Sequence, residues 1–571
     1  MPQPRPLFAA TLLLSCAMHA QQPTQQAPPD TIFFHGNILT AAGPDDSVRV
    51  SALAVRDGKI VRGGGDSSIL ALKGPHTKLI DLGGHFAMPG FNDAHTHIAD
   101  AGRQRLSVDL DGTASLADMQ SRITSYVAHA APGQWILGGG WDHTKWASKT
   151  LPTRQDLDSV TAGHPAFLVR TDGHIAVANS AALEAAHITG STVAPQGSKI
   201  DLDANGNPTG IIREDAAFEL LERVIPRPDA SVRRKALQLS IDDALAHGVT
   251  SVQDFSDWED FLVLEAMERD AEHDGTLPIR VSEWLTFNDP VDVLQQHRAS
   301  HPADDPYLHT GMLKGFMDGS LGSRTAALLA PYSDDPTNSG LPRYDQEKLN
   351  EMTAERALAG FPIGFHAIGD RANSMALTAF DQARTERMKR IQSILPLQHP
   401  RYRIEHAQVL DPKDFDRYAR LHIIASMQPS HLLTDMAWAG DRLGPERVKY
   451  AYAWRSFLDH HVTLAFGTDY PVESISPFRG LYAAITRQNE AGTATFQPQE
   501  RLTLNEALFA YTQGSAFAEN AEKQKGRLEP GFLADLVVLD RDITKATPQE
   551  LLHTRVLRTV VGGQTRYLAR D

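Results

Sequence analysis

Short apolar segments alternate with longer amphipathic segments over most of the chain, and this alternation predicts its fold class. Helices are expected in several of the longer segments, such as residues 345–359 (DQEKLNEMTAERALA) and 372–391. The apolar segments are typical of short buried strands: HFAMPGFNDAHTH, VTSVQDF, IRVSEW, MLKGFMD, PIGFHAIGD, RIEHAQ, HIIASMQP and TLAFGTDYP. Strands that alternate with helices form a parallel sheet with the helices outside, so we expect an α/β fold, a TIM-type (β/α)8 barrel.

The two ends of the chain have a different pattern. Residues 31–88 and 523–571 carry short β-rich segments that are separated by Gly and Asp turns, such as ALAVRDGKIV and GRLEPGFLADLVVLD. We expect both ends to pair into one small, discontinuous β-sandwich, with the barrel of residues 89–522 between its two halves. The segment from about residue 100 to about residue 240 is longer than one strand-to-strand connection needs, so we expect an inserted lid subdomain there.

The N-terminal segment is typical of export. Residues 1–20 contain an apolar run from Leu7 to Ala17 and are expected to be a signal peptide, and residues 21–30 form a Gln- and Pro-rich linker. Cys16, the single cysteine of the chain, lies in LLSC, which resembles a bacterial lipoprotein signal. Lipid attachment at Cys16 and ordinary cleavage are the two alternatives, and both predict a periplasmic or secreted protein.

Composition narrows the class of protein further. The chain has 571 residues, of which 42% are apolar and 22% charged, as is typical of a globular protein with a sizeable core. The formal net charge of -15 argues against a nucleic-acid-binding surface. No segment is apolar for long enough to predict a transmembrane span. We expect a small-molecule partner, and the oligomeric state stays open, with a homodimer among the alternatives.

Polar side chains recur near the carboxyl ends of the predicted strands. His95 and His97 lie two residues apart, so on a strand both imidazoles point to the same face. Further histidines, a lysine and an aspartate lie late in other strands. Because the carboxyl ends of barrel strands meet at one mouth, we expect these side chains to converge there. The six are His95, His97, Lys314, His366, His406 and Asp469.

Nitrogen and carboxylate ligands of this kind suit a borderline divalent ion, with zinc first and manganese or iron as alternatives. A cationic Lys314 would repel a metal, whereas Lys314 carbamylated by carbon dioxide is an anion that can bridge two ions. Zinc activates water as hydroxide and polarises a carbonyl group, and Asp469 is placed to pass the water proton to a leaving amine. The alternative is one ion held by His95, His97, either His406 or His366, and Asp469.

Taken together, these motifs resemble the amidohydrolase superfamily. The similarity is carried by PGFNDAHTH, HAIGD, EHAQ and GTDYPV, with GGGWDHTKW, RTDGHIAVANSAAL and KGFMDGSLGSRTAAL in addition. It is closer to the amidohydrolase-3 branch, which includes N-substituted formamide deformylase, and it extends over nearly the whole chain after residue 30. The resemblance implies these roles: His95 and His97 bind the more buried ion, carbamylated Lys314 bridges, His366 and His406 hold the second ion, and Asp469 is both ligand and proton shuttle.

Candidate substrate-binding residues lie in the expected lid. Trp141, Asp142 and His143 either line the pocket as the lid closes or form a packed aromatic turn. His174, in an Asp-Gly-His turn, either contacts the substrate or transition state or marks the boundary of a helix.

Further candidates lie beside the predicted strand ends. Arg324 pairs either with a substrate carboxylate or with Asp318. We place Asp318 and Asp370 behind the metal ligands, with Asp370 as the acceptor that orients His366. Asp254 either lines the mouth or caps a helix. For His431, after another strand end, we favour a structural role over a role in the pocket.

The sequence therefore predicts a metal-dependent hydrolase of a non-peptide carbon–nitrogen bond of amide type. An ester or lactone hydrolase that uses the same site is one alternative. A non-catalytic metal- or ligand-binding barrel protein is a second alternative, and a lyase or isomerase on the same metal scaffold is a third.

Overall fold

The computed structural model describes residues 27–41, 48–171, 175–195, 198–270, 275–390 and 400–570. The predicted signal peptide, Cys16 and His174 lie outside these residues. No helix within the described ranges is long and apolar enough to cross a lipid bilayer.

The central sheet has eight strands, and every neighbouring pair in it is parallel. In spatial order the strands are β8 (Phe91–Thr96), β15 (Val249–Asp254), β16 (Arg280–Thr286), β17 (Leu308–Phe316), β18 (Ile363–Ala367), β19 (Tyr402–His406), β20 (Ile424–Met427) and β21 (Leu464–Phe466). A parallel bridge between Thr96 and Tyr470 brings the first and last strands together. The prediction of a TIM-type barrel is confirmed.

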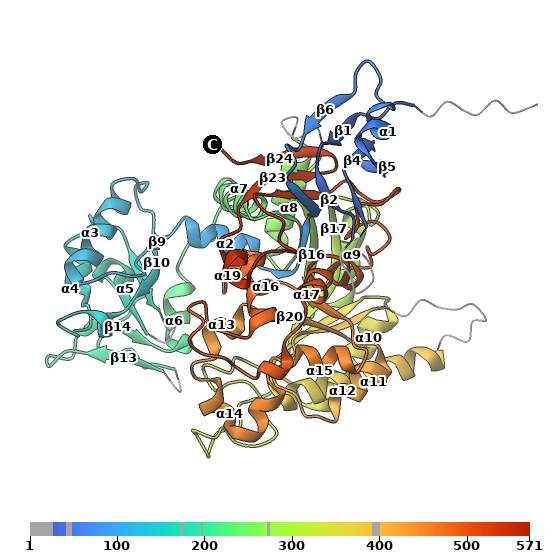
Figure 1. Cartoon of the computed structure of the whole chain (residues 1–571). Helices are drawn as coiled ribbons and strands as arrows, with labels where there is room; N and C mark the ends of the chain where they lie inside the picture. Colours follow the sequence, from blue (N-terminus) through green and yellow to red (C-terminus); the bar gives the residue numbers. More distant parts are fainter. Residues whose placement is uncertain are drawn as a thin grey trace, which may run out of the picture.

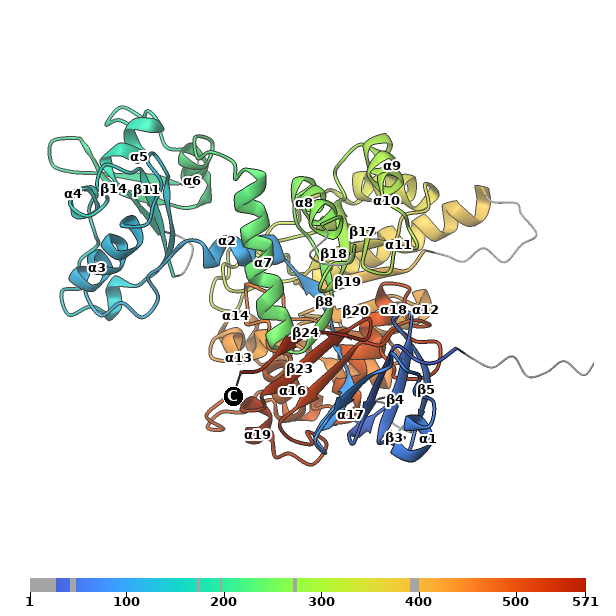
Figure 2. The same ribbon diagram turned by 90° about the horizontal axis from the view of Figure 1, so that it is seen from above.

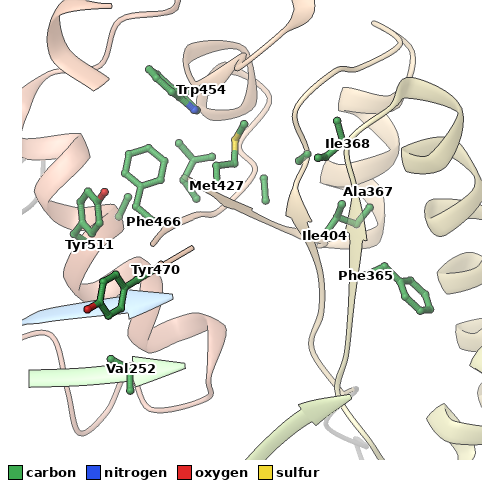
Figure 3. Packing of buried hydrophobic residues seen from close by; sticks show 14 of the residues in the cluster. Val252, Phe365, Ala367, Ile368, Ile404, Met427, Trp454, Phe466, Tyr470 and Tyr511 are labelled. Carbon is green, nitrogen blue, oxygen red and sulfur yellow. The ribbon is translucent and has the colours of Figure 1, made fainter. Parts of the chain in front are cut away.

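Helices cover the outside of this barrel (Figures 1 and 2). The ends of these helices follow local sequence signals. Helix α10 (Gln346–Leu358) begins after Asp345, whose side chain accepts a hydrogen bond from the backbone N–H of Lys348. Helix α11 (Asp370–Arg390) covers the second predicted helix up to residue 390 and packs against α10. Between strands and helices, apolar residues such as Phe365, Ile404 and Phe466 form the main core (Figure 3).

A separate six-stranded sheet follows β8 and lies beside the barrel (Figures 1 and 2). Its strands are β9 (Val108–Asp109), β10 (Ile136–Trp141), β11 (Ala166–Arg170), β12 (Ile175–Ala178), β13 (Lys199–Leu202) and β14 (Pro208–Arg213). The chain enters this insertion through α2 (Ile98–Arg105) and leaves it through α7 (Ala230–Ala246). These two helices pack so closely that a Cβ atom on Gly102 would lie 1.9 Å from the carbonyl oxygen of Ala236.

Two further sheets lie at the chain ends, one built from N-terminal strands alone and one from strands of both ends. One contains β1 (Thr31–Phe34), β4 (Ala52–Arg56), β5 (Lys59–Gly64) and β6 (Lys78–Asp81), and the other contains β2 (Asn37–Leu39), β3 (Arg49–Val50), β7 (Phe86–Pro89), β22 (Leu536–Leu539), β23 (Val556–Val561) and β24 (Gln564–Leu568). Antiparallel pairing of β7 with β22 joins the two chain ends. Arg280 of the barrel forms two hydrogen bonds of 2.7 and 2.8 Å to Asp535, which fix the barrel to these sheets.

Candidate metal centre

Three potential ligands converge where barrel strands end. His95 comes from β8, His406 from β19, and Asp469 from the loop after β21. Each offers one ligand atom, and these atoms all lie within 4.8 Å of one another. All three residues are buried, with at most 6% of their surface exposed. A buried group of two imidazoles and one carboxylate suits a divalent cation.

His95 and His97 face the same carboxylate oxygen. His95 Nε2 lies 3.5 Å from Asp469 Oδ1, and His97 Nε2 lies 3.2 Å from the same oxygen. The two imidazole rings are 5.3 Å apart, although His97 is the first residue after β8. The two-residue spacing therefore brings both imidazoles to one point.

The other ring nitrogen of His95 is held by a buried carboxylate. Glu405 Oε2 lies 2.9 Å from His95 Nδ1, and Arg403 donates hydrogen bonds to both oxygens of Glu405. Burial raises the pKa of Glu405, but Arg403, His95 and Lys314 outweigh this effect and lower its pKa to about 2. Because an ionised carboxylate can only accept, Nδ1 carries the hydrogen and the Nε2 lone pair faces Asp469.

His97 and His406 are oriented in the same way. His97 Nδ1 lies 2.9 Å from the carbonyl oxygen of Phe255, and His406 Nδ1 lies 2.9 Å from Gln428 Oε1. Both acceptors fix the hydrogen on Nδ1 and leave Nε2 for the centre. Metal-binding histidines are held by such acceptors, so these residues fit a divalent ion.

His366 lies against His406, with ring centroids 4.5 Å apart. Its Nε2 is 3.2 Å from the carbonyl oxygen of Gly319 and 3.5 Å from Asp318 Oδ1, which leaves Nδ1 for a ligand. Backbone N–H groups of Ala327 and Gly369 each donate to Asp318 Oδ2 at 2.8 Å and fix this carboxylate in place. Asp318 therefore supports His366.

The expectation that Asp370 orients His366 is wrong. Asp370 Oδ1 accepts from the backbone N–H groups of Leu329 and Arg371 at the start of α11. Backbone N–H groups at a helix start lack partners within the helix, and the Asp370 carboxylate satisfies one of them.

Lys314 points into the same centre from β17. Its Nζ lies 3.0 Å from His95 Nε2, and the residue is only 1% exposed. Its Nζ also lies 5.3 Å from the ring centroid of Trp284 and 5.1 Å from that of Phe316. Burial, assisted by the charge of Arg403, lowers the pKa of Lys314 to about 8. A larger share of this amine is therefore neutral than in water.

Asp469 is held as an anion. Burial would raise its pKa, but His95, His97, His406 and His431 together keep that pKa well below its usual range. His431, from α13 (His431–Asp435), places Nε2 3.5 Å from Asp469 Oδ2. His431 therefore lines the candidate metal centre, whereas the sequence favoured a structural role for it.

Several residues around the centre were not predicted. Glu405 and Gln428 hold imidazoles, Arg403 holds Glu405, and the Trp284 ring packs 5.1 Å from that of His95. Glu405 directly precedes His406 in EHAQ, and this position could have identified it from the sequence. Nothing in a single sequence distinguishes Gln428 from other glutamines.

The residues of the insertion form a hydrophobic core of their own. Trp141 is fully buried, donates from Nε1 to the carbonyl oxygen of Leu168 at 2.9 Å, and packs near Trp146. Of the two alternatives for Trp141, its contacts favour the packed aromatic turn over the pocket lining, because its ring fills the apolar core of the insertion. Asp142 forms an ion pair with Arg170 at 2.6 Å, and His143 begins a short 3-10 helix.

Arg324 and Asp254 also have defined partners. Arg324 makes two hydrogen bonds of 3.1 and 2.9 Å to Asp334, so pairing with Asp318 is wrong. Asp334 lies in an exposed loop, whereas the oxygens of Asp318 are occupied by backbone N–H groups. Asp254 accepts from the backbone N–H of Ile98 at 2.7 Å, which is the helix-cap alternative.

Comparison with known proteins identifies the family of this chain. The profile of the amidohydrolase family matches residues 78–567. Protein LONG AFTER FAR-RED 3 of Arabidopsis thaliana is 33% identical over 550 residues, which are 94% of this chain and 91% of that protein. N-substituted formamide deformylase of Arthrobacter pascens is 28% identical over 556 residues, covering 94% of this chain and 98% of the deformylase.

A solved structure agrees over a similar length. An uncharacterized metal-dependent hydrolase from Pyrococcus horikoshii OT3 superimposes with a TM-score of 0.75 at 30% identity, covering 91% of this chain and 99% of that one. The family profile and these relatives confirm the resemblance seen in the strand-end motifs. The chain therefore belongs to the amidohydrolase family, in its amidohydrolase-3 branch.

Proposed function

We propose that the protein hydrolyses a non-peptide carbon–nitrogen bond of amide type. The observation that carries this proposal is the ionised, buried Asp469, whose Oδ1 lies 3.2 and 3.5 Å from the Nε2 atoms of His97 and His95. Such a carboxylate can bind a metal on one side and accept a proton on the other. The similarity to a protein named N-substituted formamide deformylase supports an amide as the substrate class.

Two divalent ions, zinc in the first place and manganese or iron as alternatives, would be held by the six residues of the centre. His95, His97 and Asp469 would hold one ion, and His366 and His406 the other. Bound divalent ions lower the pKa of water and polarise a carbonyl group. The single-ion alternative keeps Asp469, His95, His97 and either His406 or His366.

Asp469 would manage the proton in this reaction. Hydrolysis adds the hydroxyl of water to the carbonyl carbon and one proton to the departing nitrogen. Asp469 would take the proton from the attacking water and deliver it to the nitrogen as the carbon–nitrogen bond breaks. His431 lies 3.5 Å from Asp469 Oδ2 and would hold this carboxylate edge in place.

Lys314 would act as a carbamate. Its neutral amine would combine with carbon dioxide, form a nitrogen–carbon bond and release one proton, which leaves an anionic bridging group. Two features support this reaction: the side chain is 1% exposed, and Nζ lies 3.0 Å from His95 Nε2. An uncarbamylated lysine at this place would repel cations, because it is a positive charge among metal ligands.

The test is metal analysis of the purified protein together with a substrate panel. The panel contains N-formyl and N-acyl amines, cyclic amides, carbamates, esters and lactones, run in water labelled with oxygen-18. We expect metal-dependent release of an amine and one labelled oxygen in the acid product. Turnover confined to esters or lactones would support the ester alternative, and metal binding without any turnover would support a binding protein. Products without labelled oxygen would indicate a lyase or isomerase.

The N-terminal segment supports export as a further part of the proposal. The apolar run of the first twenty residues has the length and flanks of a secretory signal, and LLSC offers Cys16 as a lipid acceptor. Cell fractionation of the full chain should place the protein outside the cytoplasm. A shift of Cys16→Ala from the membrane fraction to the soluble fraction would support the lipid anchor. Identical fractionation of both proteins would support ordinary cleavage.

A further inference from the structure

A second group of potential metal ligands lies away from the candidate metal centre. Glu268 ends α8 (Trp258–Glu268), His301 follows α9 (Val291–Ser300), and Asp305 lies in the loop before β17. One ligand atom from each residue lies within 4.8 Å of the other two. β17 begins near this group and carries Lys314 near its other end, so the two sites are separated by roughly 20 Å along the strand.

His301 is oriented by a carboxylate outside this group. His301 Nδ1 lies 2.8 Å from Glu265 Oε1, one turn earlier on α8. A carboxylate oxygen accepts hydrogen bonds, so Nδ1 is the donor in this contact. A ring with its single hydrogen on Nδ1 has its lone pair on Nε2. An acceptor that fixes one ring nitrogen and leaves the other free is typical of a metal-binding histidine.

The free nitrogen faces two more acceptors. His301 Nε2 lies 3.5 Å from Asp305 Oδ2 and 3.8 Å from Glu268 Oε2. Among the described residues it has no hydrogen-bond partner, and the His301 side chain is only 8% exposed. A buried polar atom without a partner is costly, because it has given up its hydrogen bonds to water. A cation between His301 Nε2, Asp305 Oδ2 and Glu268 Oε2 would give this nitrogen the partner that it lacks.

The carboxylates of this group are also arranged in a way that suits a bound cation. The backbone N–H groups of Tyr307 and Leu308 donate to Asp305 Oδ1 at 2.7 and 3.2 Å, which directs Oδ2 at His301. Burial, followed by the nearby charges of Asp305 and Glu265, raises the pKa of Glu268 to about 7. Negative charge is therefore crowded around the His301 imidazole.

We propose that Glu268, His301 and Asp305 bind a divalent cation that takes mixed nitrogen and oxygen ligands, such as zinc or manganese, with Glu265 orienting His301. Such an ion would tie the end of α8 to the end of α9 and to the start of β17. The side chain of Asp305 is 23% exposed and offers the path of entry. The site would stabilise the outer layer of the barrel and take no part in the reaction at the metal centre.

The first test compares the metal content of full-length variants after loading with zinc and removal of the excess. Glu268→Gln keeps the size of the side chain and should retain one zinc ion less per chain than the parent protein. Glu259→Gln changes an exposed carboxylate on the same helix and should retain the parent content. Equal zinc content in the parent and Glu268→Gln would overturn the proposal.

The second test does not depend on a variant that folds. Crystals of the parent protein soaked with zinc are measured at the zinc absorption edge. An anomalous peak between His301 Nε2, Glu268 Oε2 and Asp305 Oδ2 would confirm the site. Peaks at the metal centre alone would overturn the proposal while leaving the proposed function untouched.

Discussion

Glu405 Oε2 lies 2.9 Å from His95 Nδ1, although 310 positions separate the two residues in the chain. Both side chains are fully buried, and Arg403 holds the Glu405 carboxylate from behind. The direction in which His95 presents Nε2 is therefore set by β19, not by the strand that carries His95. Glu405 therefore sets the orientation of His95 in the centre.

Glu405→Gln should lower metal affinity by about 10- to 100-fold, because His95 loses the acceptor that orients it. The change also leaves Arg403 buried without its carboxylate, so the free energy of unfolding should fall by about 3–5 kcal/mol. Metal titration and urea denaturation measure the two effects. Glu446→Gln, at an exposed carboxylate, should change neither. Parent-like metal affinity in Glu405→Gln would contradict this orienting role.

The Glu405 carboxylate should also make the free energy of unfolding depend on pH in the acidic range. Its pKa is about 2 in the folded protein against a usual value of 4.5, so its stabilising contribution is complete above pH 4.5 and is lost as the pH falls toward 2. By pH 3 the metal-free parent protein should lose about 2 kcal/mol of unfolding free energy through this residue alone. Urea denaturation at pH 7 and pH 3 measures the decline, which should be smaller in Glu405→Gln. Equal declines would show that Glu405 does not titrate as its contacts require.

Asp469→Asn should reduce kcat/KM by about 10²- to 10⁴-fold, because an amide cannot take up the proton of the attacking water. The side chains have nearly the same shape, so the circular dichroism spectrum should stay unchanged. Asp416→Asn, at a carboxylate with 89% of its side chain exposed, is the matched control. Turnover close to that of the control would remove Asp469 from the mechanism.

Lys314→Ala should lower both metal content and turnover, because it removes the proposed bridging carbamate. Short carboxylic acids such as acetate should restore part of the activity, since they supply a carboxylate in the space left by the side chain. Lys545→Ala, at an exposed lysine, should behave like the parent with and without acetate. Unchanged metal content in Lys314→Ala would favour the single-ion alternative.

Gly102→Ala should destabilise the protein by about 1–3 kcal/mol, because the added methyl group would lie 1.9 Å from the carbonyl oxygen of Ala236. Backbone atoms of α7 cannot rotate away as a side chain can, so α2 and α7 must separate. Gly440→Ala meets no atom within 4 Å and should be neutral or more stable by up to about 1 kcal/mol. Thermal unfolding measures both. Equal melting temperatures for the two variants would show that the helices tolerate a wider spacing.

Local pattern was enough to predict the scaffold of the centre. The alternation of apolar strands and amphipathic helices predicted the barrel, because burial on both faces of a parallel strand leaves a short apolar run. The spacing of His95 and His97 placed both imidazoles on one face, because side chains alternate along a strand. The late position of Lys314, His366 and His406 in their strands then indicated a common mouth.

The sequence by itself therefore determined which elements form and which end of the barrel carries the polar side chains, because both depend on neighbours within a few residues. Only the tertiary structure decided which side chains are partners. Glu405 contacts His95, Asp318 rather than Asp370 contacts His366, and Asp334 pairs with Arg324. These pairs depend on strand register and on loop conformations such as the positive φ of 57° at Arg324. Such contacts join residues that are remote in sequence, and no local periodicity encodes them.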